Sequence, residues 1–310
     1  MRLPLLITGL LAATTNALAI EYFFISLEQN NAQTNAAEVT ERNHEFYATV
    51  EGTGFPYGTV SVNGGPEHTL VDEGDFLEYS QTFSSESALT TFAPLGGTYT
   101  LGGYNDNIPS ATPINITGPG GAFADRLPTA PRFTISGVTG TWSTVLDGNN
   151  LPVGIFTFDP TSVTSFTVTL NAFDTPTDGA FYGGFASVGS VNGNVYSEID
   201  EAGSGPDALP GSPTTTTLTF TKGLADNAGD GDPLTYGFVD GNTFELEGGF
   251  FNIVSLTETG LGDGSEKGFI FGNTTSFLLK ADSSAIPEPS SYAALIGGLA
   301  LAGALLRRRR

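Results

Sequence analysis

The segment Ser165-Phe166-Thr167-Val168-Thr169-Leu170-Asn171-Ala172 alternates apolar side chains with hydroxyl and amide side chains. The same two-residue period recurs at residues 98–101, 132–136 and 217–221. Alternation of this kind places one side of a β-strand in a core and the other in water, as in antiparallel sheets. Because no helical period interrupts the chain between these segments, the sequence predicts an all-β fold made of antiparallel β-sandwich modules.

Turn signals separate the predicted strands at the intervals expected of sandwiches, and they provide the positive φ angles of tight hairpins. They are Asn63-Gly64, Asp147-Gly148, Asp178-Gly179, Asn192-Gly193 and Asp240-Gly241. About sixteen to twenty strands fit between such signals, which suits either two modules or one large one. Because the chain is rich in glycine, a β-helix and a jelly roll remain alternatives.

A stretch rich in proline and glycine divides the body of the chain. This composition predicts a first module over residues 20–110, a linker over 111–131 and a second module over 132–285. Toward the end of the first module, Pro94-Leu95-Gly96-Gly97-Thr98-Tyr99-Thr100-Leu101 resembles a strand found in many extracellular β-sandwiches. We use this short resemblance for the fold alone.

The composition excludes several classes of function. The 310 residues include 33 acidic and 11 basic side chains, giving a formal net charge of −22. Nucleic-acid binding depends on clustered lysine and arginine, so no nucleic-acid partner is expected. The chain has no cysteine, which excludes disulfides, cysteine-ligated zinc, iron–sulfur clusters and thiol nucleophiles.

The first nineteen residues have the order of a secretory signal peptide. Arg2 supplies the positive start, an apolar run follows over residues 3–13, and Ala17-Leu18-Ala19 forms a small-x-small cleavage site. We therefore expect residues 1–19 to be removed by signal peptidase and the exported chain to begin at Ile20.

The C-terminal end has three parts in a fixed order. Pro287-Glu288-Pro289 comes first, an uncharged run follows over residues 292–306, and Arg307–Arg310 close the chain. The run is long enough for a short, tilted membrane helix. Basic residues remain on the cytoplasmic side of membranes, so the body would lie outside the cell, in agreement with the signal peptide.

These three parts resemble the PEP-CTERM sorting signal over residues 286–310. The resemblance implies a bacterial host of the Gram-negative type and recognition by exosortase, a membrane-embedded transpeptidase. It also implies transient insertion in the inner membrane, removal of the helix, and delivery to the cell surface or the exopolysaccharide matrix. Pro287, Glu288 and Pro289 would be recognition residues of a substrate and would have no catalytic part.

The sequence offers little for catalysis. Nucleophilic hydrolysis usually needs a histidine beside the nucleophile, and the chain has only His44 and His68. Both lie at apparent strand starts, where we expect them to face solvent. No serine lies in a G-x-S-x-G elbow, so we expect no catalytic residues and a protein that is not an enzyme.

Calcium is the one cofactor that a motif suggests. Asp226-Asn227-Ala228-Gly229-Asp230-Gly231-Asp232 places three carboxylates and one amide in a glycine-bent loop. Ca²⁺ prefers several such oxygen ligands, so Asp226, Asn227, Asp230 and Asp232 are candidate ligands. A solvated acidic turn is the alternative interpretation, and residues 71–75 and 198–201 are weaker versions of the motif.

The function predicted for the body is structural or adhesive at the surface or in the matrix. A calcium-assisted glycan-binding module is the first alternative, with Trp142 and Tyr182 as aromatic residues that could stack on sugar rings. A secreted carbohydrate-active hydrolase, acting through paired carboxylates, is the second.

Overall fold

The computed structural model describes residues 20–52, 58–74, 76–102, 113–171, 181–190, 196–199, 216–223, 235–255 and 266–284. Within these ranges the chain forms eighteen strands in three sheets and one short helix. The prediction of an all-β fold is therefore confirmed.

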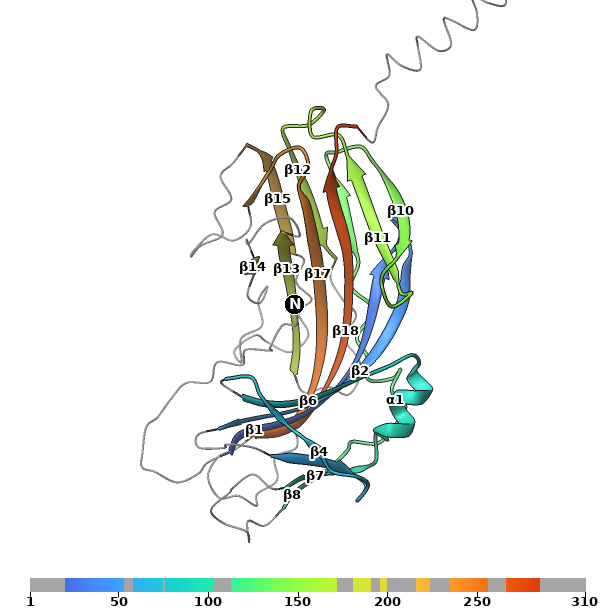
Figure 1. Ribbon diagram of the computed structural model, residues 1–310, viewed down its shortest axis with the longest axis vertical. Coiled ribbons are helices and arrows are strands. Elements are labelled where there is room, and N and C mark those ends of the chain that lie inside the picture. Colours follow the sequence, from blue (N-terminus) through green and yellow to red (C-terminus); the bar gives the residue numbers. More distant parts are fainter. Residues whose placement is uncertain are drawn as a thin grey trace, which may run out of the picture.

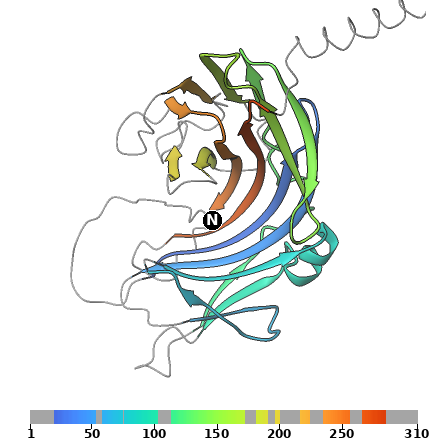
Figure 2. The ribbon, with the colours of Figure 1, turned by 45° about the horizontal axis from the view of Figure 1, so that its top comes forward.

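The largest sheet has ten strands and is strongly curved (Figures 1 and 2). Its main path runs through β14 (Tyr196–Ile199), β13 (Phe181–Ser190), β17 (Thr243–Ser255), β18 (Glu266–Ala281), β1 (Ile20–Gln33), β2 (Val39–Gly52), β6 (Phe76–Phe83) and β5 (Val71–Asp72). Beside this path, β10 (Gly140–Leu146) pairs with β11 (Pro152–Phe158), and β11 pairs with β18. We call this the long sheet.

Strand β18 lies in the middle of the long sheet. On one side it pairs antiparallel with β17, from Ser255–Gly268 to Thr243–Lys280. On the other side it pairs parallel with β1 and then, beyond the end of β1, parallel with β11. The alternating pattern did not predict these parallel pairs, because it shows which side chains share a face and not which strands are neighbours.

Two four-stranded sheets complete the structure. The first, at the lower end in Figure 1, has the order β4 (His68–Thr69), β3 (Thr59–Val62), β7 (Thr98–Gly102), β8 (Ile114–Thr117). The second, at the upper end, has the order β16 (Thr235–Phe238), β15 (Thr216–Lys222), β12 (Ser165–Leu170), β9 (Phe133–Ser136).

Each small sheet encloses its own core against the long sheet. The first core joins β3, β7 and β8 to β1, β2 and β6, and includes Phe23, Phe46 and Tyr99. The second joins β9, β12, β15 and β16 to β11, β13, β17 and β18. In β12 the side chains of Phe166, Val168 and Leu170 are buried in the second core, as the alternation predicts.

Strand β18 contributes to both cores from a single face. Phe269 and Phe271 belong to the first core, and Phe277 and Leu279 belong to the second. All four are odd-numbered and so lie on the same side of the strand. Thus there are two cores on one sheet, and the first core takes Phe269 and Phe271 from the segment predicted as the second module.

Polar side chains lie between the two cores and bind the connecting segment. Asn273 donates from Nδ2 to the carbonyl of Pro128 at 2.9 Å, and Asn252 donates in the same way to Arg126 at 2.9 Å. Asn31 in turn donates to Oδ1 of Asn273 at 2.6 Å. The part of the predicted linker that the structure describes is therefore bonded to the long sheet.

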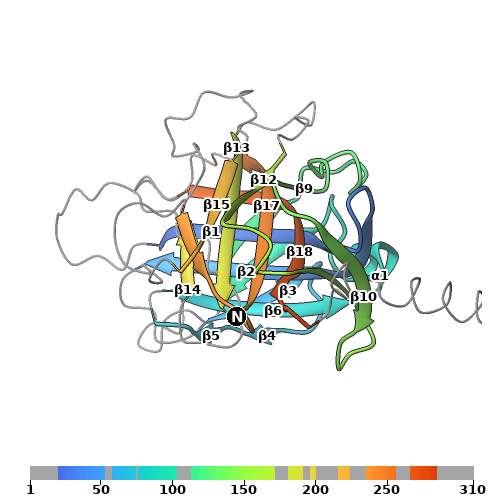
Figure 3. The same cartoon turned by 90° about the horizontal axis from the view of Figure 1, so that it is seen from above.

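A short helix, α1 (Glu86–Phe92), lies beside β2 and β6, at the right-hand edge of the view in Figure 3. Ser85 caps it by accepting a bond from the amide of Ala88 at 3.2 Å, and Leu89 is buried in the first core. The sequence prediction missed this helix, because seven residues are too few to establish a helical period.

Tyr99 explains the resemblance of residues 94–101 to sandwich strands. Its ring is fully buried, and its hydroxyl donates to the carbonyl of Pro94 at 2.9 Å. Such a bond from a tyrosine to backbone a few residues upstream fixes a corner of the chain in many sandwich proteins. Burial also raises the pKa of Tyr99, which therefore stays protonated.

Candidate functional site

The end of β18 is the point where the folded body passes into the C-terminal tail. The amide of Gly241 donates to the carbonyl of Ala281 at 2.8 Å, and the amide of Ala281 donates to the carbonyl of Asn242 at 2.9 Å. On the other side, the amide of Asp282 donates to the carbonyl of Phe158 at 2.9 Å. The strand end is thus bonded to the β16–β17 turn and to the end of β11.

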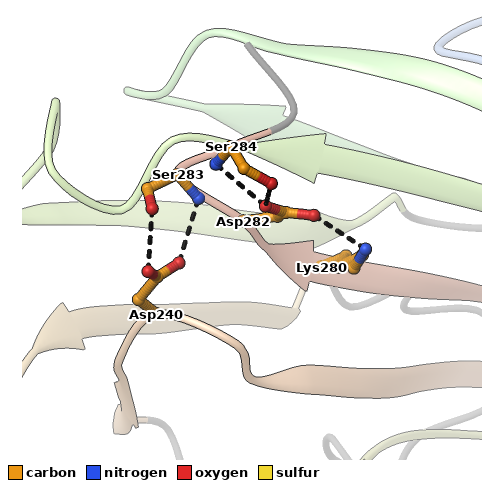
Figure 4. Close-up of polar contacts among 5 residues, drawn as sticks. All are labelled: Asp240, Lys280, Asp282, Ser283 and Ser284. Carbon is orange, nitrogen blue, oxygen red and sulfur yellow. Dashed lines mark hydrogen bonds and ion pairs between the residues drawn. The ribbon is translucent and has the colours of Figure 1, made fainter.

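Two carboxylates extend this attachment over the next two residues (Figure 4). Asp240 accepts bonds from the amide and the hydroxyl of Ser283 at 2.9 and 2.8 Å. Asp282 accepts bonds from the amide and the hydroxyl of Ser284 at 2.9 and 2.6 Å, and forms an ion pair with Lys280 at 2.8 Å. We call these five residues the exit clamp.

Both carboxylates of the exit clamp are stabilised in the ionised form. The bonds from the backbone and hydroxyl of Ser283 lower the pKa of Asp240 below its usual value. The bond from Lys280, followed by those from Ser284, lowers the pKa of Asp282. Both carboxylates are therefore ionised at neutral pH, the form that accepts these bonds most strongly.

The face of the long sheet that points away from the two cores carries glutamates, two of which have a raised pKa. Glu28 on β1 lies directly across from Glu45 on β2, and burial followed by repulsion from Glu45 raises the pKa of Glu28 from 4.5 to about 8. Burial and repulsion from Glu245 raise the pKa of Glu247 on β17 to about 7. We call Glu28, Glu45 and Glu247 the acidic face.

The acidic face has hydrogen bonds of its own. The hydroxyl of Ser26 donates to Glu28 at 3.1 Å, and Thr82 donates to Glu45 at 3.1 Å. Tyr47 also donates to Glu45. In the part of the chain that the structure describes, no three acidic or histidine side chains are grouped so as to hold a metal ion. Within the acidic face, Glu28 and Glu247 are the residues whose pKa is raised, by burial and by repulsion from neighbouring carboxylates.

The predicted site residues are only partly described. The calcium loop with Asp226, Asn227, Asp230 and Asp232 lies outside the described ranges, as do the cleavage residues Ala17 and Ala19 and the sorting residues Pro287, Glu288 and Pro289. The structure therefore does not test their roles, which stay predictions.

The structure places the two aromatic candidates on different strands. Trp142 is half-buried on β10, and its ring packs against Phe156 and Phe277, each with centroids 5.3 Å apart. Tyr182 lies on β13 opposite Asn252 of β17. Trp142 therefore contributes to the second core, and its predicted contact with sugars stays a prediction.

The histidines differ from the expectation of two solvent-facing side chains. His44 is fully buried, because β2 begins five residues earlier, at Val39, and places His44 on the same face as Phe46. Burial lowers the pKa of His44, so its imidazole is neutral at pH 7. His68 begins β4 as expected, but it is half-buried and packs on Tyr79 with centroids 4.6 Å apart.

The residues of the exit clamp were not predicted from the sequence. Asp240 belongs to a turn signal that suggested a hairpin, yet β16 and β17 belong to different sheets, and the turn carries the chain between them. Its bonds to Ser283 join residues 43 positions apart, which no local pattern shows. The only local signal is Asp282 followed by Ser283 and Ser284, a sequence that favours a side-chain-capped turn.

Comparison with known families adds one match. A family model described as the PEP-CTERM protein-sorting motif matches residues 285–310, and the comparison with curated proteins gives no match. The described residues end at Ser284 and include no helix that is long and apolar enough to cross a membrane. Immediately after the exit clamp, the chain thus carries a PEP-CTERM protein-sorting motif, as its C-terminal residues predicted.

Proposed function

We propose that the chain is an exported protein that exosortase sorts to the cell surface or to the exopolysaccharide matrix, where its β-sheet body has a structural or adhesive role without catalysis. The observation that carries the proposal is the position of the sorting motif. It begins one residue after Ser284, the last residue of the exit clamp, which itself closes the central strand of the long sheet.

The acidic composition is compatible with such a location. With 33 acidic and 11 basic residues, most carboxylates have no basic partner and must be solvated or neutralised by mobile cations. Strong net charge keeps a surface protein soluble and limits association between copies. Signal peptidase and exosortase would be the processing partners, and exopolysaccharide the material in which the body resides.

The experiment that tests this proposal follows the tail through export. Mass spectrometry of surface and matrix fractions should find material that lacks Arg307–Arg310 and the preceding helix. Replacing Pro287, Glu288 and Pro289 by alanine should leave uncleaved precursor in the inner membrane. Glu67→Ala, at an exposed acidic residue of the body, is the matched control and should be sorted normally. Full-length protein in the matrix fraction would contradict the proposal.

Glycan binding with the help of calcium is a second function, and the position of Trp142 on an edge strand favours it. Strand β10 pairs only with β11 among the described strands, and the Trp142 side chain, although it packs against the second core, is only partly buried. Two results would support glycan binding. Trp142→Ala and Tyr182→Ala should each abolish capture of the protein by polysaccharide, and a calcium chelator should weaken this capture if the 226–232 loop binds calcium. A pull-down that neither variant changes would remove this function.

A hydrolase is the third function, and the raised pKa of Glu28, directly across from a second glutamate, is the observation behind it. Glycoside hydrolysis uses one protonated and one ionised carboxyl group, and Glu28, with a pKa near 8, lies across from Glu45. Turnover of an oligosaccharide that Glu28→Gln abolishes would establish this activity. Absence of turnover across the polysaccharides of the host matrix would exclude the acidic face as its site.

A further inference from the structure

The strand that leads to the sorting motif is bonded along both of its sides. From Gly268 to Lys280 it pairs with β17. Along its other side it pairs with β1 from Tyr22–Glu266 to Ala32–Ser276, and with β11 from Ile155–Leu278 to Phe158–Ala281. No stretch of β18 longer than a residue or two therefore lacks a neighbour on either side.

The direction of these strands decides how a pull on the tail is resisted. Because β1 runs parallel to β18, it begins at the end of the pair opposite to the end from which the tail leaves. The arrow of β18 in Figure 1 points away from the first small sheet, so the chain leaves β18 at the end far from that sheet. Tension between the tail and the end of the body that holds the first small sheet therefore acts along the strands.

We propose that β18 is a load-bearing strand, through which tension on the sorted tail is transmitted to the whole long sheet in shear. The inference rests on the proposed function, because only a tail that is attached at the surface carries tension. In shear, the bonds along both sides of β18 bear the load together. When a strand is peeled from one end, the same bonds break one pair at a time.

The side chains of β18 add to this resistance. Phe269 and Phe271 are fully buried in the first core, and Phe277 and Leu279 are buried in the second. Sliding by one residue would turn all of them to the opposite face, and sliding by two would move each out of its packed position. A shift of β18 along its axis thus disrupts both cores at once.

The exit clamp determines where tension enters. Asp240 holds Ser283 from the β16–β17 turn, and Asp282 is bonded through its amide to Phe158 at the end of β11. Neighbours on both sides of β18 therefore hold the chain at the point where it leaves the sheet. Peeling from that point would first have to break the bonds to both neighbours.

Single-molecule force spectroscopy in two directions tests the proposal. Because the chain has no cysteine, one introduced cysteine and a handle on the tail define the direction of pulling. Glu51→Cys places the handle on β2 at the end opposite to the exit, where Glu51 pairs with Tyr22, and loads β18 in shear. Val239→Cys, at an exposed residue beside the exit, peels β17 from β18 at the Thr243–Lys280 pair.

We expect an unfolding force at least about twofold higher for Glu51→Cys than for Val239→Cys, since forced unfolding follows the barrier along the direction pulled. Equal melting temperatures of the two variants and the parent would show that both fold normally. Forces that do not depend on direction would overturn the load-bearing role, whether or not the tail is sorted in cells. Direction-dependent forces in a protein that is not sorted would overturn the proposed function and leave the mechanical property of the fold established.

Discussion

The side-chain amide of Gln33 pairs with the backbone of Phe133 as a neighbouring strand would. Nε2 of Gln33 donates to the carbonyl of Phe133 at 2.8 Å, and the amide of Phe133 donates to Oε1 of Gln33 at 2.7 Å. Gln33 ends β1 and is fully buried, whereas Phe133 begins β9 in the second small sheet. This one side chain thus joins the long sheet to the second core at the point where the connecting segment ends.

Gln33→Leu should destabilise the protein by about 2 to 4 kcal/mol, because it leaves a buried amide and a buried carbonyl of Phe133 without partners. Gln33→Glu, which keeps an acceptor and loses the donor, should also destabilise, since it adds a buried charge beside a carbonyl. The free energy of unfolding from urea titration measures both effects. Gln81→Leu, at a half-exposed glutamine of β6 that accepts a bond from the Tyr79 hydroxyl at 2.7 Å but bonds no backbone group in the described structure, is the control and should lower it by less, because water can replace the lost bond. An unchanged free energy of unfolding in Gln33→Leu would show that solvent reaches the backbone of Phe133.

Position 154 of β11, which lies against the backbone of Gln33, has room only for a glycine. Gly154 on β11 lies so close to β1 that a Cβ atom there would overlap the backbone carbonyl of Gln33. Gly154→Ala should therefore lower the free energy of unfolding by more than about 1 kcal/mol, because backbone on both sides must move.

Gly148→Ala is the matched control for this substitution. Gly148 lies in the turn between β10 and β11, and a Cβ atom there would meet nothing within 4 Å. It should be neutral or slightly stabilising, because alanine restricts the unfolded chain more than glycine does. Equal melting temperatures for the two variants would contradict the close approach of β11 to β1.

Local patterns predicted the faces of the strands but not their partners. The alternation of Phe166, Val168 and Leu170 with hydroxyl residues is a property of neighbouring residues, and it correctly showed which side is buried. The pairing of β1 with β18 joins the first strand of the body to the last and requires two nearly complete cores, so no short window contains it. For the same reason the sorting motif could be predicted from its own residues, whereas Asp240 and Ser283 of the exit clamp could not.

Stability should fall as the pH rises from about 4.5 to about 8. On the acidic face, burial and repulsion from neighbouring glutamates raise the pKa of Glu28 to about 8 and that of Glu247 to about 7, from an ordinary value of 4.5. In this window the folded state retains protons that the unfolded chain has released, so increasing pH favours unfolding. Melting temperatures measured across the window should decrease, and the curve should level off above it.

Amide substitutions on the acidic face should remove most of this dependence. Glu28→Gln and Glu247→Gln remain uncharged at every pH, so the double variant should be more stable than the parent at pH 8 and similar to it near pH 4.5. Glu67→Gln, at an exposed glutamate, should preserve the slope of the parent. A slope unchanged in the double variant would assign the pH dependence to other groups.

The exit clamp should protect the first residues of the tail from opening. Asp240→Ala removes both bonds to Ser283, and hydrogen exchange at the Ser283 amide should accelerate by about tenfold, as expected for loss of one charge-assisted bond. Protease cleavage between Asp282 and Ser284 should become faster for the same reason. Asp159→Ala is the matched control, because Asp159 caps the turn after β11 through Thr161 and makes no bond to the tail in the described structure.

The pH dependence of the clamp separates it from the acidic face. Since the hydrogen bonds of Ser283 lower the pKa of Asp240 below its ordinary value of 3.8, its contribution is present above that value and is lost only as the pH falls through the lower pKa of the folded state. The protection factor of the Ser283 amide, which corrects for the base-catalysed intrinsic rate, should thus stay constant from about pH 5 to 8, the range over which Glu28 and Glu247 lose their protons. If protection decreased as the pH rose and Glu28 lost its proton, the two regions would be coupled, and the clamp would not hold the tail by itself.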